Sequence, residues 1–202
     1  MADARSYKGE KTKELIVMAA LELFAKDGFD LVSMQKIGDK VGISQAAVAQ
    51  YFGTKRNLIM SVRSHVTQSN YGFVDTAIDP YSKSYEQLYV HCYRNIEWAF
   101  KNPGMTQILL LTYYFSFNDN VFREHQNKTV ETATLRIEKY VIGHSHEVAT
   151  LPKNKIRNIS EEIHRWLLGY FLRDVSISNS HSFKSKKVSE SVHLFLKKIL
   201  LK

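Results

Sequence analysis

The sequence of 202 residues has a single cysteine, three prolines and nine glycines. One thiol cannot form a disulfide within the chain, so Cys92 excludes a disulfide-stapled fold and is typical of a reducing compartment. The scarcity of proline and glycine favours long helices over a turn-rich β-sandwich. The longest apolar run, near residues 108–117, is too short to cross a bilayer, and the N-terminus lacks the apolar stretch of a signal peptide. These absences predict a cytoplasmic protein without a membrane partner.

Charge is unevenly distributed along the chain. The formal net charge is +8 and the pI is about 9.4, which indicates an anionic partner without identifying one. Most of the excess lies in residues 151–202, where lysines are frequent. A solvated lysine-rich surface is the simplest interpretation of that segment, and contact with DNA or a membrane is the alternative.

Apolar residues recur at helical spacing along most of the chain, and no segment reads as a strand or a repeat. The first clear stripe runs from residue 12 to residue 24 and ends at Asp27-Gly28, a left-handed stop. The pattern and its breaks predict helices over residues 12–24, 34–40, 45–51, 55–77, 82–101, 104–116, 119–143, 153–177 and 185–201. The predicted fold class is therefore all-α, with a compact head of three short helices at residues 1–54 and a larger helical bundle at residues 55–202.

Residues 33–52 have the pattern of a helix-turn-helix. Ser33 is a candidate N-cap for the first of two short helices, Gly42 breaks that helix, and Ser44 is a candidate N-cap for the second. Small residues are predicted to let the two helices approach closely, namely Gly38, Ala46 and Ala47. The predicted inward face comprises Ile37, Val41, Ile43, Val48 and Phe52.

The opposite face of the second helix is small and polar, and it suits a DNA major groove. Glutamine can form paired hydrogen bonds to adenine, and an alanine methyl can contact thymine. Backbone N–H groups and a hydroxyl at the start of the first helix could bind a phosphate, and two further side chains follow the second helix where they could hold the DNA backbone. The predicted DNA-binding residues are Ser33, Ser44, Gln45, Ala46, Ala49, Gln50, Tyr51 and Lys55.

Residues 12–62 resemble the DNA-binding domain of the TetR family of transcriptional regulators. The order and spacing of several blocks carry this resemblance. They are Ala19-Ala20-Leu21-Glu22-Leu23-Phe24-Ala25, Asp27-Gly28-Phe29, Ser33, Ile37, Val41-Gly42-Ile43-Ser44, Ala47-Val48, Tyr51-Phe52, Lys55 and Asn57-Leu58. The sequence departs from the family at position 49, where Ala49 stands in place of the usual aromatic residue, and at Gln50, where histidine is frequent.

The resemblance implies a homodimer bound to a roughly palindromic operator in double-stranded DNA. It also implies that the helices after the head bind a small-molecule effector and that the last two helices dimerise. Two apolar stripes at helical spacing fit that last role, and they also fit an internal core. The candidate dimerisation residues are Ile163, Trp166, Leu167, Tyr170, Val192, Phe195, Leu196 and Ile199.

Aromatic side chains are frequent after residue 88, which indicates a roomy pocket for a lipophilic or aromatic molecule. The same residues at helical spacing would also serve as ordinary core. The candidate pocket residues are Tyr93, Trp98, Tyr113, Tyr114, Phe117 and Trp166.

Catalytic and metal-binding patterns are weak. His144 and His146, followed by Glu147, do not share a helix face and lack a third ligand at a fixed spacing, so no metal and no cofactor are expected. His91-Cys92 and Glu161-Glu162 near His164 come without an oxyanion loop or a nucleophile elbow, so an enzyme is not expected. The prediction is a ligand-released repressor. The alternative is a DNA-binding protein of the same fold without a small-molecule effector, serving chromosome organisation or controlled by a protein partner.

Overall fold

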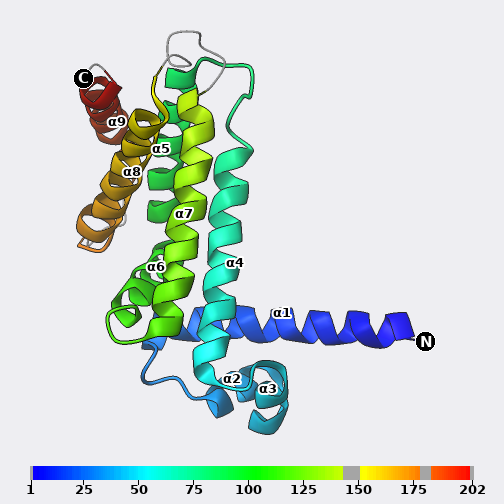
Figure 1. Cartoon of the computed structure of the whole chain (residues 1–202). Helices are drawn as coiled ribbons and strands as arrows, with labels where there is room; N and C mark the ends of the chain where they lie inside the picture. The colour runs from blue at the N-terminus through cyan, green and yellow to red at the C-terminus, as the bar shows by residue number, and fades with distance from the viewer. Residues whose placement is uncertain (1, 143–150, 178–182, 201–202) are drawn as a thin grey trace. The chain divides into compact units, whose positions relative to one another are not determined.

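The computed structural model describes residues 2–142, 151–177 and 183–200, and within them the chain forms nine α-helices, one π-helical turn and no strand (Figure 1). The predicted all-α class is confirmed for this part of the chain. Two compact units are present: residues 1–69 with 107–109 form the first, and residues 70–106 with 110–202 form the second. None of the helices described is both long enough and apolar enough to span a membrane.

The first unit contains α1 (Ala2–Asp27), α2 (Met34–Val41), α3 (Gln45–Phe52) and most of α4 (Lys55–Asp75). Helix α1 begins ten residues before the predicted start, because its first turns are polar and carry no apolar stripe for the pattern to detect. It ends as predicted at Gly28, whose φ of +84° places it in the left-handed region. The core of this unit includes Ile16, Ala20, Phe24, Val32, Ile37, Val48, Leu58, Ile59 and Val62.

The second unit contains the end of α4 together with α5 (Ser84–Lys101), most of α6 (Pro103–Phe115), α7 (Asn120–Ile142), α8 (Lys153–Tyr170) and α9 (Ser185–Leu200). Helix α5 is its central element, since α7, α8 and α9 all contact it. Helix α8 was predicted to continue to residue 177. Its α-helical hydrogen bonding instead ends at Tyr170, and a π-helical turn follows over Phe171–Val175.

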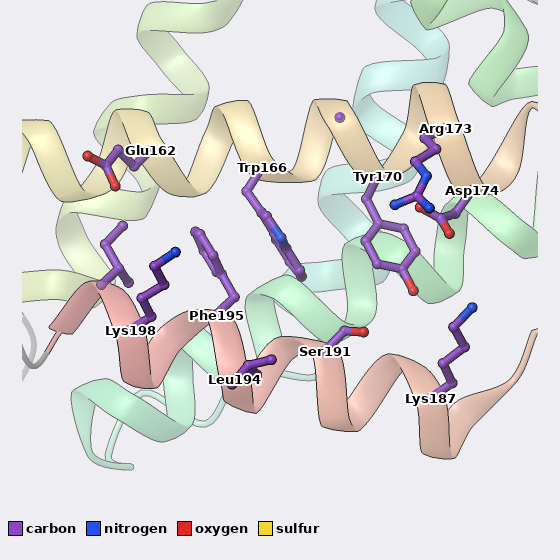
Figure 2. Close-up of a pocket in the computed structure, with 12 residues that line it drawn as sticks. Glu162, Trp166, Tyr170, Arg173, Asp174, Lys187, Ser191, Leu194, Phe195 and Lys198 are labelled. Atoms are coloured by element: carbon purple, nitrogen blue, oxygen red, sulfur yellow. The ribbon is translucent and has the colours of Figure 1, made fainter.

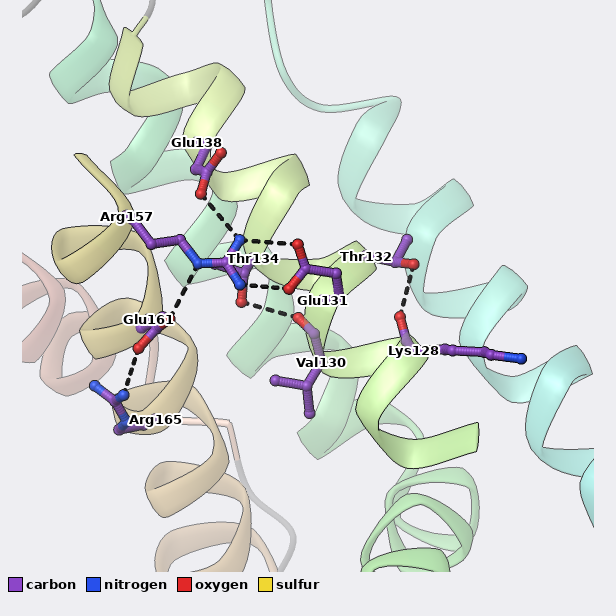
Figure 3. A network of polar contacts seen from close by, with 9 residues as sticks. All are labelled: Lys128, Val130, Glu131, Thr132, Thr134, Glu138, Arg157, Glu161 and Arg165. Atoms are coloured by element: carbon purple, nitrogen blue, oxygen red, sulfur yellow. Dashed lines mark hydrogen bonds and ion pairs between the residues drawn. The ribbon is translucent and has the colours of Figure 1, made fainter. Parts of the chain in front are cut away.

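A network of ion pairs joins α7 to α8 (Figure 3). The guanidinium of Arg157 donates to Glu131 and Glu138 on α7 and, through Nε at 3.0 Å, to Glu161 on its own helix. Arg165 donates to the other oxygen of Glu161 at 2.6 Å. These bonds raise the pKa of Arg157 and lower the pKa values of Glu131 and Glu161. Because the side chains remain partly exposed, the network fixes the pairing of the two helices and contributes little net stability.

Candidate functional site

Two helix caps and a glycine turn, all three predicted from the sequence, build the helix-turn-helix. Ser33 caps α2 by accepting a hydrogen bond from the Lys36 N–H at 3.0 Å, and Ser44 caps α3 by accepting from the Ala47 N–H at 3.1 Å. Gly42 ends α2 with φ +79°, a conformation that favours glycine, and the next N–H, of Ile43, donates to the Gly38 carbonyl. Caps and turn together set the angle at which α3 leaves α2.

At Gly38, helix α2 lies close to the backbone of the turn that follows it. A Cβ built on Gly38 would lie 2.6 Å from the Ile43 carbonyl oxygen and 3.3 Å from the Ser44 carbonyl carbon, both of which are backbone atoms. Ala46 was predicted to assist this approach, but it is exposed, and Ala47 is only half-buried. An added Cβ at position 38 therefore requires the backbone of the turn to shift.

The inward face of the motif is narrower than predicted. Ile37 and Val48 are fully buried and Phe52 is nearly so. Val41 and Ile43, also expected inside, are half-buried because they border the turn. The three buried side chains are enough to fix which face of α3 points outward.

The outward face of α3 presents small and polar side chains, as the DNA-binding prediction requires. Gln45, Ala46 and Gln50 are exposed, and Ala49 is half-buried beside them. Tyr51 is 38% exposed and its ring lies against that of Phe52, with 6.5 Å between centroids. These five side chains remain predicted DNA contacts.

Lys55 stands at the first position of α4 and already has partners in the free protein. Its Nζ lies 4.2 Å from the centroid of the Phe29 ring and 3.4 Å from the Asp30 carbonyl oxygen. Burial of the ammonium lowers its pKa, and the nearby charge of Asp30 opposes that effect. An ammonium has three donors, so Lys55 can hold this loop and still donate to a phosphate.

Two other lysines of the motif are paired with α1. Lys36 Nζ lies 3.0 Å from Asp27, and Lys40 Nζ lies 2.9 Å from Glu22. The Ser33 hydroxyl is likewise engaged as a cap. The predicted phosphate contact of Ser33 therefore depends on its remaining hydrogen-bonding capacity and on the exposed start of α2.

The six candidate pocket residues lie in different surroundings. Trp98 is buried, with 1% of its surface exposed, and Tyr113 is half-buried. Tyr93 packs against Tyr89 and Phe183, with ring centroids 5.8 and 5.6 Å away. In contrast, Tyr114 and Phe117 at the end of α6 are 64% and 76% exposed, and Trp166 lies between α8 and α9. The six residues thus differ in burial and in their neighbours, and their role in binding a ligand remains a prediction.

Polar side chains occupy part of the interior of the second unit, which the aromatic pattern did not reveal. His91 and Asn95 are one helical turn apart on α5 and are both buried, with the apolar residues Leu88, Cys92 and Ile96 around them. The His91 ring lies 5.2 Å from that of Tyr140 on α7. Burial, together with the charges of Arg136 and His164, lowers the pKa of His91 to about 3. Two polar residues at i and i+4 on an apolar face were the sequence signal for this feature.

Acidification is expected to destabilise the protein through His91. An unfolded histidine has a pKa near 6.5 and the folded one about 3, so the unfolded state binds the proton first as the pH falls. The contribution is fully present above pH 6.5 and declines below it, by about 2 kcal/mol between pH 8 and pH 5. Urea unfolding at a series of pH values measures this slope. His91→Leu is expected to flatten it, and an unchanged slope in that variant would contradict the assignment.

A groove runs between α8 and α9, with a volume of about 840 Å³. Figure 2 shows Trp166 and Phe195 crossing it face to face, with ring centroids 4.4 Å apart and ring planes 4° apart. Leu194 is 73% exposed at its edge and was not predicted. Glu162 and Asp174 come from the α8 side, and Lys187 and Lys198 come from α9.

The predicted dimerisation residues divide into two sets. Trp166, Tyr170, Phe195 and Ile199 line the groove, although Ile199 is only 8% exposed. Ile163, Leu167, Val192 and Leu196 are buried within the subunit and do not line it. We therefore expect contacts with a second copy to come from the first set and from Leu194, and the dimerisation role of all eight residues remains a prediction.

The metal hypothesis cannot be placed on the structure, since His144, His146 and Glu147 lie outside the described residues. Within the described ranges, no three His, Cys, Asp or Glu side chains are grouped as a metal site requires. Burial raises the pKa of the Cys92 thiol, which makes it a poor nucleophile.

Residues 16–62 match the sequence family described as "Bacterial regulatory proteins, tetR family". Among curated relatives, the nucleoid occlusion factor SlmA of Actinobacillus pleuropneumoniae is 28% identical over 105 residues, which cover 52% of each chain. SlmA of Yersinia enterocolitica is 23% identical over 109 residues, 54% of this chain and 55% of that one. The chain spans about half the length of these relatives.

Solved structures share the fold over nearly the whole chain. A TetR transcription regulator from Haloarcula marismortui superposes with a TM-score of 0.77 at 14% identity, covering 92% of this chain and 96% of that one. AibR, solved in complex with isovaleryl coenzyme A and operator DNA, superposes with a TM-score of 0.68 at 12% identity over 91% and 97% of the two chains. At these identities the likeness concerns the fold.

Proposed function

The chain belongs to the TetR family of bacterial regulatory proteins, and from that premise we propose that it is a sequence-specific DNA-binding repressor released by a small effector. The observation that carries the proposal is the outward face of α3. Its side chains are exposed, small and able to read base edges, and two capped helix starts fix its direction. In this proposal residues 1–54 read DNA in the cytoplasm, and residues 55–202 bind the effector and dimerise.

Two copies are needed for useful affinity, because one head offers few base contacts. The groove between α8 and α9 supports pairing: it exposes an aromatic pair and Leu194, and it carries carboxylates on one side and lysines on the other. A two-fold interface uses the same patch twice, so such a patch must be self-complementary. The dimer would then place its two α3 helices one DNA turn apart, about 34–36 Å.

Release requires an effector that binds the DNA-free pose better than the DNA-bound pose. The proposed ligand site is the helical bundle of the second unit, and the fold neighbour AibR has been solved with both isovaleryl coenzyme A and operator DNA. The family is one of regulators, so catalysis has no part in the proposal.

Lys55→Ala is expected to weaken binding to every DNA sequence by a similar factor. Removal of one phosphate contact should also lower the slope of log affinity against log salt by about 1. Fluorescence anisotropy between 50 and 200 mM salt measures both quantities. Lys139→Ala, which removes the same charge from an exposed position on α7, is the control and should leave the slope unchanged. An unchanged slope for Lys55→Ala would show that its contacts with Phe29 and Asp30 are its whole role.

Gln45→Ala is expected to act on sequence rather than on overall affinity. Loss of a paired hydrogen bond should cost about 1–3 kcal/mol at one base pair and relax the preference at that pair alone. Binding to a library of single-base operator variants measures this effect. A uniform loss across the library would assign Gln45 to the DNA backbone.

A second function is favoured by the SlmA relatives, whose similarity extends over more residues than the family match at 16–62. A protein of this kind would bind many chromosomal sites and answer to no small molecule. Chromosome-wide binding separates the two functions: a repressor occupies a few promoters, and an organising factor occupies many dispersed sites.

A further inference from the structure

The interior of the second unit holds a polar cluster, defined here as Asn70, His91, Asn95, Arg136 and Tyr140. Three of its members surround His91: Asn95 and Tyr140 both lie beside it, and the charge of Arg136 lowers its pKa. Asp75 at the end of α4 pairs with Arg136 and accepts from the Tyr140 hydroxyl at 3.2 Å. The formal charges of Asp75 and Arg136 cancel, so the cluster is close to neutral.

Asn70 faces the same interior from α4. Tyr71 and Asp75 contact Arg136 of α7, whereas Phe73 contacts Arg94 of α5. At 100° per residue, Asn70 and the fully buried Val74 lie on the face between those two directions. From this angle we infer that the Asn70 side chain, 8% exposed, faces α5 and α7.

Two buried groups of the cluster lack hydrogen-bond partners, and both are donors. Asn95 Nδ2 donates to the His91 carbonyl at 2.8 Å, which fixes the orientation of its amide, and the same nitrogen faces His91 Nε2 at 3.4 Å. Nε2 is then the acceptor of the ring, so the proton of the neutral imidazole resides on Nδ1. His91 Nδ1 and Asn70 Nδ2 are both unpartnered. Buried donors are normally satisfied, so a pair left open requires an explanation.

We propose that His91 and Asn70 are kept open to donate hydrogen bonds to the carbonyl oxygen of an uncharged effector, such as a ketone, ester or amide. This inference rests on the proposed effector-released function and names the chemistry of its ligand. A carboxylate fits less well, because the guanidinium of Arg136 is already paired with Asp75 and that of Arg94 with Glu97, so a buried anion would lack a free counter-charge. A purely apolar ligand would leave both donors unsatisfied. The lipophilic or aromatic effector that the aromatic residues predict should therefore also carry a carbonyl group.

The first test needs no ligand. Asn70→Leu and His91→Leu each remove an unsatisfied buried donor and keep the volume similar, so the melting temperature of the free protein should rise by about 2–4 °C. In His91→Leu, Asn95 Nδ2 keeps its bond to the backbone carbonyl of residue 91 and loses only the longer contact with Nε2. Asn127→Leu, the same change at an exposed position on α7, is the control and should leave the melting temperature nearly unchanged. A fall in both core variants would show that the two groups are structural and would overturn the proposal.

The second test uses phenyl alkyl ketones from acetophenone to octanophenone, each paired with the alkylbenzene of equal carbon number. The ketones should raise the melting temperature of the wild-type protein more than their hydrocarbon partners do, and this difference should vanish in Asn70→Leu and His91→Leu. Equal shifts within every pair, or no shift with any ketone, would overturn the proposal.

Operator binding is measured separately on the same variants, which should retain it and lose only release by the ketone. Absence of operator binding in the wild-type protein would contradict the proposed function and leave the thermal results to decide the ligand chemistry.

Discussion

Leu194→Asp is expected to separate the proposed dimer into folded monomers and to weaken operator binding by about 10²–10⁴-fold, the usual gain from linking two binding sites. Leu194 is 73% exposed on α9 at the edge of the groove, so the subunit does not need it for its own core. A carboxylate there would have to lose its water on pairing, and an ion pair with Lys198, one turn further along α9, does not repay that cost in a buried interface. Trp166 and Phe195, stacked beside it, would then remain in water.

Leu172→Asp is the matched control for this experiment. Leu172 is also exposed, at 60%, but it lies on the π-helical turn and does not line the groove. Sedimentation velocity measures the mass of each variant, and circular dichroism verifies its fold. Leu172→Asp should remain dimeric with unchanged operator affinity. A dimeric Leu194→Asp protein would place the interface on another surface.

Gly38→Ala is expected to destabilise the head by about 1–3 kcal/mol or more and to abolish measurable operator binding. The added methyl would lie 2.6 Å from the Ile43 carbonyl oxygen, and the neighbouring atoms are backbone of the turn and of the α3 cap. Such atoms cannot rotate away as a flexible side chain can, so the turn must open. Helix α3 would then lose its angle to α2, and both its caps and its exposed face would be misplaced.

Gly9→Ala provides the opposite case within the same unit. A Cβ at Gly9 meets nothing within 4 Å, and the residue lies inside α1 with ordinary helical backbone. This substitution should stabilise the helix by about 0.5–1 kcal/mol. Thermal unfolding and operator binding are measured for both variants. Gly38→Ala should lower the melting temperature, and Gly9→Ala should raise it. If Gly38→Ala bound the operator as well as Gly9→Ala does, the turn geometry would not control DNA reading.

Local features of the head were predictable because short-range chemistry determines them. A serine before an apolar-periodic stretch can cap a helix within three residues, and both Ser33 and Ser44 do so. Glycine relieves the strain of positive φ, and Gly28 and Gly42 have that conformation. The first turns of α1 were not predicted, because their sequence is mostly polar and contains no apolar stripe.

Positions in the second unit depend on long-range packing, which periodicity does not encode. Trp98 and Phe117 are both aromatic residues in segments with helical spacing. Trp98 is nevertheless buried, whereas Phe117, just after α6, is exposed. The same spacing could not separate Val192, within the core, from Leu194, on the surface, because neighbouring helices decide which face is covered. The open donors of Asn70 and His91 became visible only when α4, α5 and α7 were placed together.

DNA reading by α3 of each of two subunits is best tested by selection from a library of genomic fragments with the full chain. We expect enrichment of fragments that share an inverted repeat with half-site centres about 34–36 Å apart, and loss of that enrichment with the Gly38→Ala variant. If the wild-type protein is folded and dimeric but enriches no common sequence, α3 does not read DNA.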